Sequence, residues 1–388
     1  MPVIDASNDP RGAAVAGGVA DRLTDGLSRI DNIRVVAPRS EAGTGTERAS
    51  APSDFEVRGE LQRGQQAWIL RARMIRTATG EVRAVATVSV DADESDTQLE
   101  QSRVAAGAGH LLAGRLNRLL ETGESSDATG GSTTGSTRTV IEQATASINQ
   151  TTRERFGMAQ TMLQEALTAE SNNVDLAVAL AALQLRGIQM VWYSPDDARA
   201  GATLERALRA KPNSIPVLET YCRFLSANNR FVESLVTCAR ALSFDPWNGL
   251  ALYLVGLGQI HLGRFEDALA TFRQADRFDT PQVSRWTWLL GAGWANMMMG
   301  RGDDAVPWLQ RSIAITPASG RSHMLLAATY QQLGRLDEAR AAMKEGLRLR
   351  PGTTALNVSP PTKNASPVFL EASGRIIKLM VAAGLPES

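Results

Sequence analysis

Few of the residues that build chemical sites occur in this sequence. Its 388 residues include two cysteines, Cys222 and Cys238, and three histidines, at positions 110, 261 and 323. Two cysteines exclude both a disulfide framework and a cysteine-based metal cluster. The sequence also lacks a phosphate-binding glycine loop, a nucleophile elbow and paired carboxylates in an apolar setting. We therefore expect no enzymatic activity and no cofactor or metal.

Long hydrophobic runs and an excess of one charge sign are missing as well. No apolar stretch reaches the length of about 18 residues that would span a bilayer, and the first residues do not form a signal peptide. Lysine plus arginine equals aspartate plus glutamate, at 41 each, so no global field favours nucleic acid. Arg71, Arg73, Arg76 and Arg83 lack the interleaved aromatic side chains of a nucleic-acid surface. A solvated sheet face is the expected role of these arginines.

A repeated helical unit is what the sequence does contain. Residues 320–352 form two apolar stripes at helical spacing, separated at Gly334 and ended at Pro351. Pro351 and Pro317 lie 34 residues apart, and so do Pro246 and Pro212. A helix-turn-helix unit of this period is the signature of the tetratricopeptide repeat. The regular repeats are predicted at 215–248, 249–282, 286–319 and 320–353.

The positions around the turn support this register. The turn residue recurs as Gly334, Gly300, Gly263 and Asn229. Glycine and, to a lesser degree, asparagine tolerate the positive φ that such turns require. Two degenerate helical pairs precede the regular repeats, which makes about six. A last helix, 368–385, is expected to cover the exposed end of the array.

The first 121 residues have a different pattern. Helices are predicted at 15–30 and 98–121, a short strand at the start and another at 33–38, and a polar loop at 39–53. Three alternating runs, 55–61, 67–77 and 81–90, predict a meander of β-hairpins. We expect a mainly α protein: a tetratricopeptide α-solenoid with a C-terminal capping helix, preceded by a small α+β sandwich domain. The boundaries are 1–121 for the small domain, 122–138 for a Gly/Ser/Thr-rich linker and 139–388 for the solenoid.

Three segments of the first block also match a known pattern: Ala6 to Pro10, Ala20 to Ser28 and Arg34 to Ala37. Together with FEVRGELQRGQQAWILRARMIRTATGEVRA they resemble the TolB amino-terminal-like domain. This resemblance implies that the chain is similar to the C-terminal region of bacterial CadC-like winged-helix regulators, or to that of class III adenylate/guanylate cyclases with repeat tails. The sequence contains no winged helix and no cyclase domain, and the loop after Arg39 lacks a helix that the family usually has.

Two functions follow as expectations from the resemblance. The first is a non-enzymatic protein–protein interaction or sensory module of a bacterial signalling or transcription-regulatory protein. The alternative is the regulatory tail of a class III cyclase whose catalytic domain lies outside this chain. The coding sequence that lies upstream of Met1 in frame would separate these two. A third possibility, a free-standing adaptor that assembles other proteins, predicts a native start at Met1 and the cytoplasm, whereas the C-terminal part of a membrane-anchored regulator would lie in the periplasm. A homodimer through the first domain stays open.

The concave groove of the repeats is the predicted binding site for a protein or peptide partner. A tetratricopeptide solenoid lines this groove with fixed positions of each first helix. Its centre is rich in aromatic residues, leucine and methionine, which suit an adaptable contact with a peptide. The alternative is that these residues pack within the chain. The predicted groove residues are Arg223, Tyr253, Leu257, His261, Leu290, Trp294, Met298, Arg321, Met324 and Gln331.

Two further features lie within the repeats. Cys222 and Cys238 fall on facing positions of one helical pair, where they could close a disulfide in an oxidising compartment or serve as small buried apolar residues. His261 could respond to pH at the groove, although a surface hydrogen bond is the commoner role. Trp294→Ala distinguishes an open groove from a core: an open groove predicts unchanged melting, and a core predicts a loss above about 2 kcal/mol.

Overall fold

The computed structural model describes residues 2–36, 53–92, 96–122, 132–149, 152–189, 200–359 and 362–388. The chain divides into two compact units. Unit 1 comprises Met1–Thr122 together with two short segments of the repeats, Leu242–Asn248 and Arg277–Thr280. Unit 2 holds the remaining helices. The fold is mainly helical with one small sheet, which confirms the predicted fold class.

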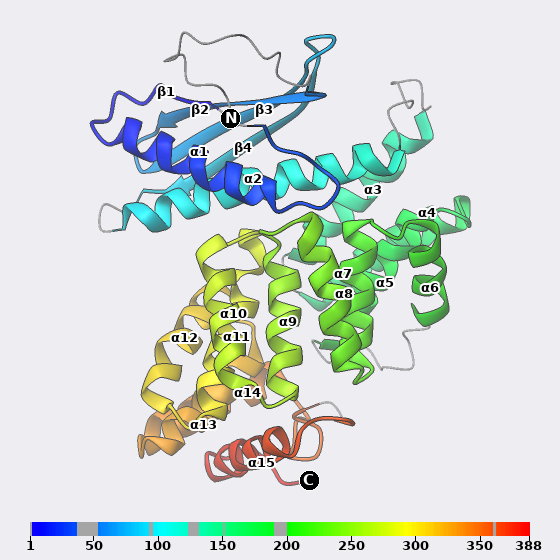
Figure 1. Ribbon diagram of the computed structural model, residues 1–388. Helices are drawn as coiled ribbons and strands as arrows, with labels where there is room; N and C mark the ends of the chain where they lie inside the picture. The colour runs from blue at the N-terminus through cyan, green and yellow to red at the C-terminus, as the bar shows by residue number, and fades with distance from the viewer. Residues whose placement is uncertain are drawn as a thin grey trace. The chain divides into compact units, whose positions relative to one another are not determined.

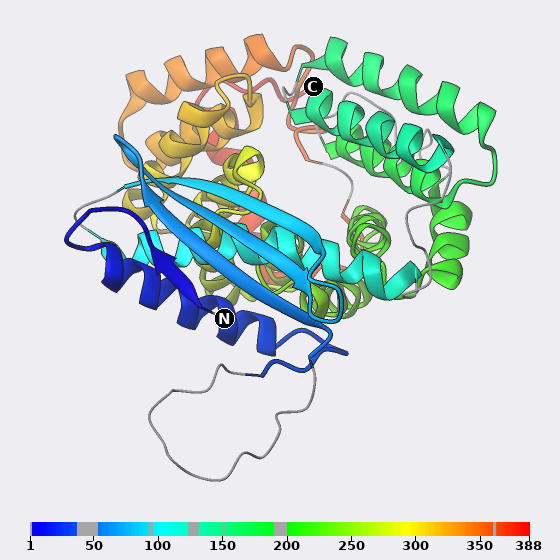
Figure 2. The same cartoon turned by 90° about the horizontal axis from the view of Figure 1, so that it is seen from above.

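Unit 1 is a four-stranded sheet with two helices on one face. The strands follow the order β1-β2-β3-β4, with β1 parallel to β2 and the other pairs antiparallel. Figures 1 and 2 show both helices on the same side of the sheet. The elements are β1 (Val3–Asp5), α1 (Gly12–Ser28), β2 (Phe55–Arg63), β3 (Ala67–Arg76), β4 (Val82–Asp91) and α2 (Thr97–Thr122).

Alternation along β3 decides which face of the sheet is covered. Trp68, Leu70 and Met74 are fully buried against the helices, while Arg71 and Arg73 between them are exposed. Successive side chains of a strand point to opposite faces, so one pattern specifies both surfaces. The strand predicted at 33–38 does not form over the described residues 33–36. Ile33 and Val35 pack against the core but do not pair with any strand, and the strand next to β2 at the edge of the sheet is β1. Most of the loop at 39–53, and residues 37 and 38, lie outside the described residues.

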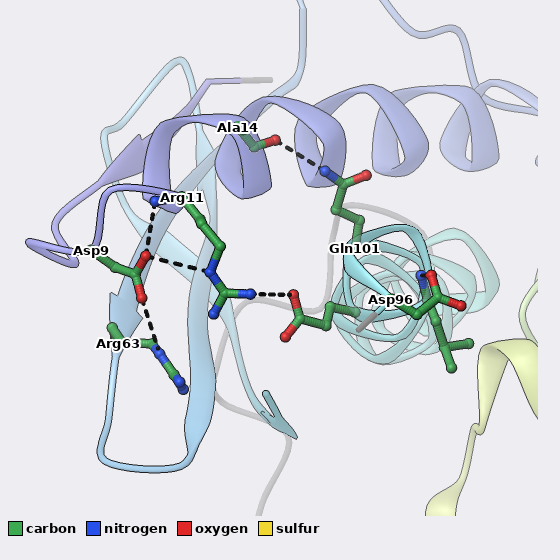
Figure 3. A network of polar contacts seen from close by, with 8 residues as sticks. Asp9, Arg11, Ala14, Arg63, Asp96 and Gln101 are labelled. Carbon is green, nitrogen blue, oxygen red and sulfur yellow. Dashed lines mark hydrogen bonds and ion pairs between the residues drawn. The ribbon is translucent and has the colours of Figure 1, made fainter. Parts of the chain in front are cut away.

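The turn before α1 is held by a charged network (Figure 3). Asp9 accepts hydrogen bonds from the backbone N–H of Arg11 at 2.8 Å and from Nε of Arg63 at 3.3 Å. The hydrogen bond from the backbone N–H of Arg11, together with the guanidinium charges of Arg11 and Arg63, holds the pKa of the Asp9 carboxyl below its usual value. Arg11 also lies 3.8 Å from the buried Glu100 of α2. The aspartate of the Ala6–Pro10 motif therefore ties the turn to β2 and α2.

Trp247, from the repeat region, completes the core of unit 1. Its indole ring is 4% exposed and belongs to the same apolar cluster as the sheet. It packs against Gly26 of α1 and Gly109 of α2, where an added methyl group would overlap with the ring. Beside it, Asp245 Oδ2 lies 2.5 Å from Nδ1 of His110. Glycine is needed at both helix positions because the indole approaches the backbone closely.

Unit 2 contains six helical pairs and a final helix among the described residues. Its two degenerate pairs are α3 (Ser132–Asn149) with α4 (Arg153–Ala169), and α5 (Val174–Gln189) with α6 (Ala200–Ala210). The four regular pairs are α7 (Ile215–Ala227) with α8 (Phe231–Phe244), α9 (Gly249–His261) with α10 (Phe265–Phe278), α11 (Arg285–Met298) with α12 (Gly302–Ile315), and α13 (Gly320–Gln332) with α14 (Leu336–Leu349). The last helix is α15 (Pro367–Ala382).

The pairs follow the predicted register. Asn229, Gly263, Gly300 and Gly334 all have positive φ at the turns between helices. The residues between the second and third predicted repeats, 283–285, fall at the end of a 3-10 turn, η2 (Gln282–Ser284), and at the first residue of α11. Helix α3 begins at Ser132, inside the segment assigned by composition to the linker, and residues 123–131 lie outside the described residues. No helix in the described ranges combines the length and apolar character needed to cross a bilayer.

Candidate functional site: the concave face of the repeats

The first helices of the repeats, α7, α9, α11 and α13, carry the predicted groove residues, which we call the concave face. Helix α15 packs against two of these helices, α11 and α13. The start of α15 also reaches α9, where the backbone N–H of Ser366 donates to the carbonyl of His261 at 2.9 Å. The C-terminal helix therefore covers part of the concave face, with its apolar side facing the groove positions.

Aromatic rings form the centre of this contact, and we call Phe231, His261, Trp294 and Phe369 the aromatic cluster. The imidazole of His261 stacks on Phe231 with ring centroids 4.3 Å apart and lies 4.7 Å from Phe369 of α15. Trp294 meets the edges of His261 and Phe369 at 5.8 and 6.1 Å. Offset and edge-on rings at such distances attract one another beyond simple burial. The cluster joins three repeats to α15.

Burial separates the ten predicted groove residues into two groups. Buried residues include the hydrophobic ones and Arg223; Met324 is fully buried, and Trp294 retains 8% exposure. The half-buried residues are Tyr253, His261, Arg321 and Gln331. The backbone carbonyl of Met298 accepts a hydrogen bond from Nη2 of Arg375 on α15, at 3.2 Å. Helix α15 of the same chain thus packs on the C-terminal part of the predicted groove, and partner binding at these residues stays a prediction.

A narrow gap remains between α13 and α15. It is lined on the repeat side by Trp294, Arg321 and Met324, and on the α15 side by Ser373, Ile376 and Met380. The guanidinium of Arg321 lies over the Trp294 ring, 4.9 Å from its centroid. A cation above an aromatic face is attracted by the ring's electron density. Arg321 therefore lies at the boundary of the area of the concave face that α15 covers.

Arg186 also belongs to the concave face, because the predicted groove residues Arg223 and Tyr253 act on its charge. It is not among the predicted groove residues, all of which come from the regular repeats. It lies on α5, in a degenerate repeat, and the described part of that helix carries one other charge, Asp175. Burial and the neighbouring charge of Arg223 lower the pKa of Arg186 to about 10. A lone cation near the end of an apolar helix was the signal in the sequence. Because that repeat departs from the regular 34-residue pattern, its groove positions could not be assigned from the sequence, and Arg186 was missed.

The two cysteines form a disulfide between α7 and α8, with their Cα atoms 5.5 Å apart. Both side chains are fully buried. The bond closes a loop with a sequence separation of 16, a size for which cross-linking stabilises by roughly 3 kcal/mol through the unfolded chain. It fixes the first regular repeat, which carries Arg223.

His261 gives the site a dependence on pH. Burial among the rings lowers its pKa to about 4, the hydrogen bond from its ring to the Leu257 carbonyl opposes this, and the charge of Arg321 adds to the lowering. Because the folded pKa is below the unfolded value, the unfolded state takes up the proton first. Stability is therefore expected to fall as the pH drops from about 6.5 to about 4, by at most about 3 kcal/mol from this residue.

The measurement is chemical denaturation at neutral pH and near pH 4, for wild type and His261→Phe. The variant should lose less stability on acidification than wild type, because phenylalanine keeps the ring contacts and takes no proton. His323→Phe, outside the aromatic cluster, serves as the matched control. Equal acid sensitivity in wild type and His261→Phe would show that His261 is not shielded by α15.

The fold and the concave face define a tetratricopeptide repeat solenoid. The tetratricopeptide repeat family matches residues 296–357, which cover α12, α13 and α14. Tetratricopeptide solenoids are interaction folds that present an extended concave surface, and the matched family indicates no catalytic chemistry. No curated protein matches the chain.

Solved structures of other repeat proteins resemble the chain more loosely. The protein pilF of Pseudomonas aeruginosa is 17% identical, with a TM-score of 0.41 over 57% of this chain and 96% of its own. PilW, described as a type IV pilus biogenesis factor, is 19% identical, with a TM-score of 0.40 over 53% of this chain and 90% of its own. YrrB, a TPR protein described as having an unusual peptide-binding site, is 15% identical, with a TM-score of 0.33 over 49% and 93%.

Proposed function

We propose that this chain is a non-enzymatic interaction module that binds a protein or peptide partner on the concave face, around Tyr253. The observation that supports this most is the packing of α15. Phe369, Ile376 and Met380 of that helix are buried on the first helices of the last repeats. A surface that holds a helix of its own chain has the shape and apolar character to hold a segment of another.

The part of the face next to α15 keeps some exposure. Tyr253 and Arg186 are half-buried. Tyr253 lies in the first half of α9, whereas α15 contacts that helix at its last residue, His261, and Arg186 lies on α5. Tyrosine offers an apolar ring and a polar hydroxyl with few rotatable bonds, which makes it a frequent anchor in interfaces. We place the partner contact here, beside the helix that already occupies the rest.

The setting that we propose is a bacterial signalling or transcription-regulatory protein. The support is the resemblance of the Ala6–Pro10, Ala20–Ser28 and Arg34–Ala37 segments to the TolB amino-terminal-like domain. In this proposal the repeats recognise the partner, and the output lies in another polypeptide segment or another protein.

A site-specific cross-link tests the binding surface. A photoreactive phenylalanine analogue replaces Tyr253 in the full chain, inside bacterial cells, and the matched control carries it at Val236, which is 68% exposed on α8. Position 253 should capture a defined protein that position 236 does not. Capture of the same proteins from both positions, or of none at position 253, would contradict a partner site on the concave face.

A further inference from the structure

Strand β4 forms one edge of the sheet in unit 1 (Figure 1). It pairs with β3 on one side, and among the described residues no strand pairs with its other side. Its 10 residues make it much longer than β1, the 3-residue strand at the opposite edge. A strand at an edge presents a row of backbone N–H and C=O groups that can pair with another strand. The outer side of β4 is therefore a surface for backbone pairing.

The ladder with β3 determines which backbone groups of β4 point outward. The N–H of Ala92 donates to the carbonyl of Gln66 at 2.9 Å. In an antiparallel ladder such hydrogen-bonded pairs recur at every second residue, so the even-numbered residues of β4 bond to β3. The N–H and C=O groups of the residues between them, Val85, Thr87 and Ser89, consequently point toward the open edge.

Features that normally prevent edge-to-edge pairing are missing from most of this strand. Natural edges carry prolines, lysines or inward-pointing charges that make pairing unfavourable. The segment Ala84–Val90 contains neither proline nor any charged residue. Val85 is 53% exposed, and Thr87 and Ser89 are exposed beside it on the outer face of the sheet. Valine and threonine are β-branched residues that suit a paired strand.

Protective features do occur where β4 begins. The register of the ladder shifts between Val82 and Ala84, and such irregularities turn an edge away from a neighbour. There the carbonyl of Arg83 accepts a hydrogen bond from Nε of Arg115 on α2, at 3.2 Å. The regular part of the open edge therefore runs from Ala84 to Asp91.

This edge is complementary to a second copy of itself. Antiparallel pairing centred on Thr87 sets Thr87 of one copy opposite Thr87 of the other, and Val85 opposite Ser89. The outward N–H and C=O groups of each residue then meet those of the opposite residue. Side chains directly opposite one another share a face of the sheet, where threonine pairs are favourable. The same patch is used on both copies, which is the geometry of a closed two-fold dimer.

Charge selects the antiparallel arrangement. Arg83 and Asp91 lie at the two ends of the uncharged segment. Antiparallel pairing brings the arginine end of one copy to the aspartate end of the other, whereas parallel pairing would bring like charges together. Arg83 already pairs with Glu81 of its own copy at 3.1 Å. The unlike charges therefore remove repulsion more than they add a new bond.

We propose that two copies of this chain associate through antiparallel pairing of their β4 strands, which joins the two sheets into one continuous sheet. The surface belongs to unit 1 and uses none of the residues of the concave face, so the inference does not depend on the proposed function. Pairing of a single strand edge buries little surface compared with a permanent interface. We therefore expect a reversible equilibrium between monomer and dimer.

Sedimentation velocity of the full chain over a range of concentrations tests the proposal. Wild type should form a dimer as the concentration rises. Thr87→Lys and Thr87→Glu should each weaken this association at least about tenfold, because the two-fold axis sets identical charges opposite each other. An equimolar mixture of the two variants should restore the dimer, because lysine then faces glutamate. Restoration would also show that both variants are folded.

Gln62→Lys is the matched control, because Gln62 is exposed on β2, inside the sheet rather than at the β4 edge. It should leave the association unchanged. Wild type that stays monomeric at every concentration would overturn the proposal. So would a dimer that Thr87→Lys leaves intact, or a mixture of the two charged variants that fails to associate.

A cross-link gives a second readout that does not depend on charge. Opposite residues of a hydrogen-bonded antiparallel pair have Cα atoms about 5.5 Å apart, a distance that a disulfide can span. Oxidation of Thr87→Cys should therefore join two chains, and oxidation of Gln62→Cys should not. Cys222 and Cys238 are already bonded to each other. A dimer in which Thr87→Cys does not cross-link would place the interface elsewhere and reject pairing through β4.

Discussion

Replacing Trp247 by alanine should destabilise unit 1 more than any other single change in the segments that the repeats contribute to it. The indole is 4% exposed and fills the space between Gly26 of α1 and Gly109 of α2. Neither glycine has a side chain that could move into the cavity. We therefore expect a loss of about 3–5 kcal/mol in the free energy of unfolding of that unit, the range for buried tryptophan.

Hydrogen exchange is the suitable measurement, because a chain with two units need not unfold in one step. In Trp247→Ala, amides of α1 and α2 should lose protection by a large factor. Trp308→Ala is the control: Trp308 of α12 is half-buried and its ring stacks on Arg311. It should leave α1 and α2 unchanged. Unaltered protection of α1 and α2 in Trp247→Ala would mean that the ring is not part of that core in solution.

Trp294→Ala should also be strongly destabilising, here in unit 2. The ring is 8% exposed and contacts His261 and Phe369. A loss of about 3 kcal/mol or more is expected, above the limit that separates a core position from an open groove. Chemical denaturation followed by circular dichroism measures it. Unchanged stability would show that α15 leaves the concave face open in solution.

A double-mutant cycle makes this second prediction sharper. Phe369→Ala removes the α15 side of the same contact, so the two losses should not add. The coupling should be about 0.5–1.5 kcal/mol, as for other aromatic pairs. Leu370→Ala, one residue further on the same helix and 52% exposed, should change stability by no more than about 0.5 kcal/mol. Full additivity would place Trp294 and Phe369 in separate environments.

The helices and the repeat register could be predicted from the sequence because their signals are local. The spacing of apolar residues, the prolines at helix ends and the turn residues Asn229, Gly263, Gly300 and Gly334 each act within one helical pair. Facing positions in one pair also bring Cys222 and Cys238 together, since the two helices are joined by a short turn. For the same reason the hairpin strands of unit 1 were predicted within a residue or two.

Contacts between distant segments were decided by the tertiary structure alone. Periodicity marks Trp294 and Trp247 as apolar positions, but it does not say that α15 covers the first or that the second enters the core of unit 1. Residues 33–36 have strand-like composition, but they take no part in the four-stranded ladder, and Ile33 and Val35 pack on the core instead.

Arg186 shows the same division. It belongs to a different helical pair from Arg223, whose charge helps to lower its pKa, and local patterns carry no information on how these pairs face one another. The sequence by itself determined that this protein is a repeat solenoid with a small α+β domain. Long-range packing between helical pairs decided which surface α15 covers and which residues it buries there.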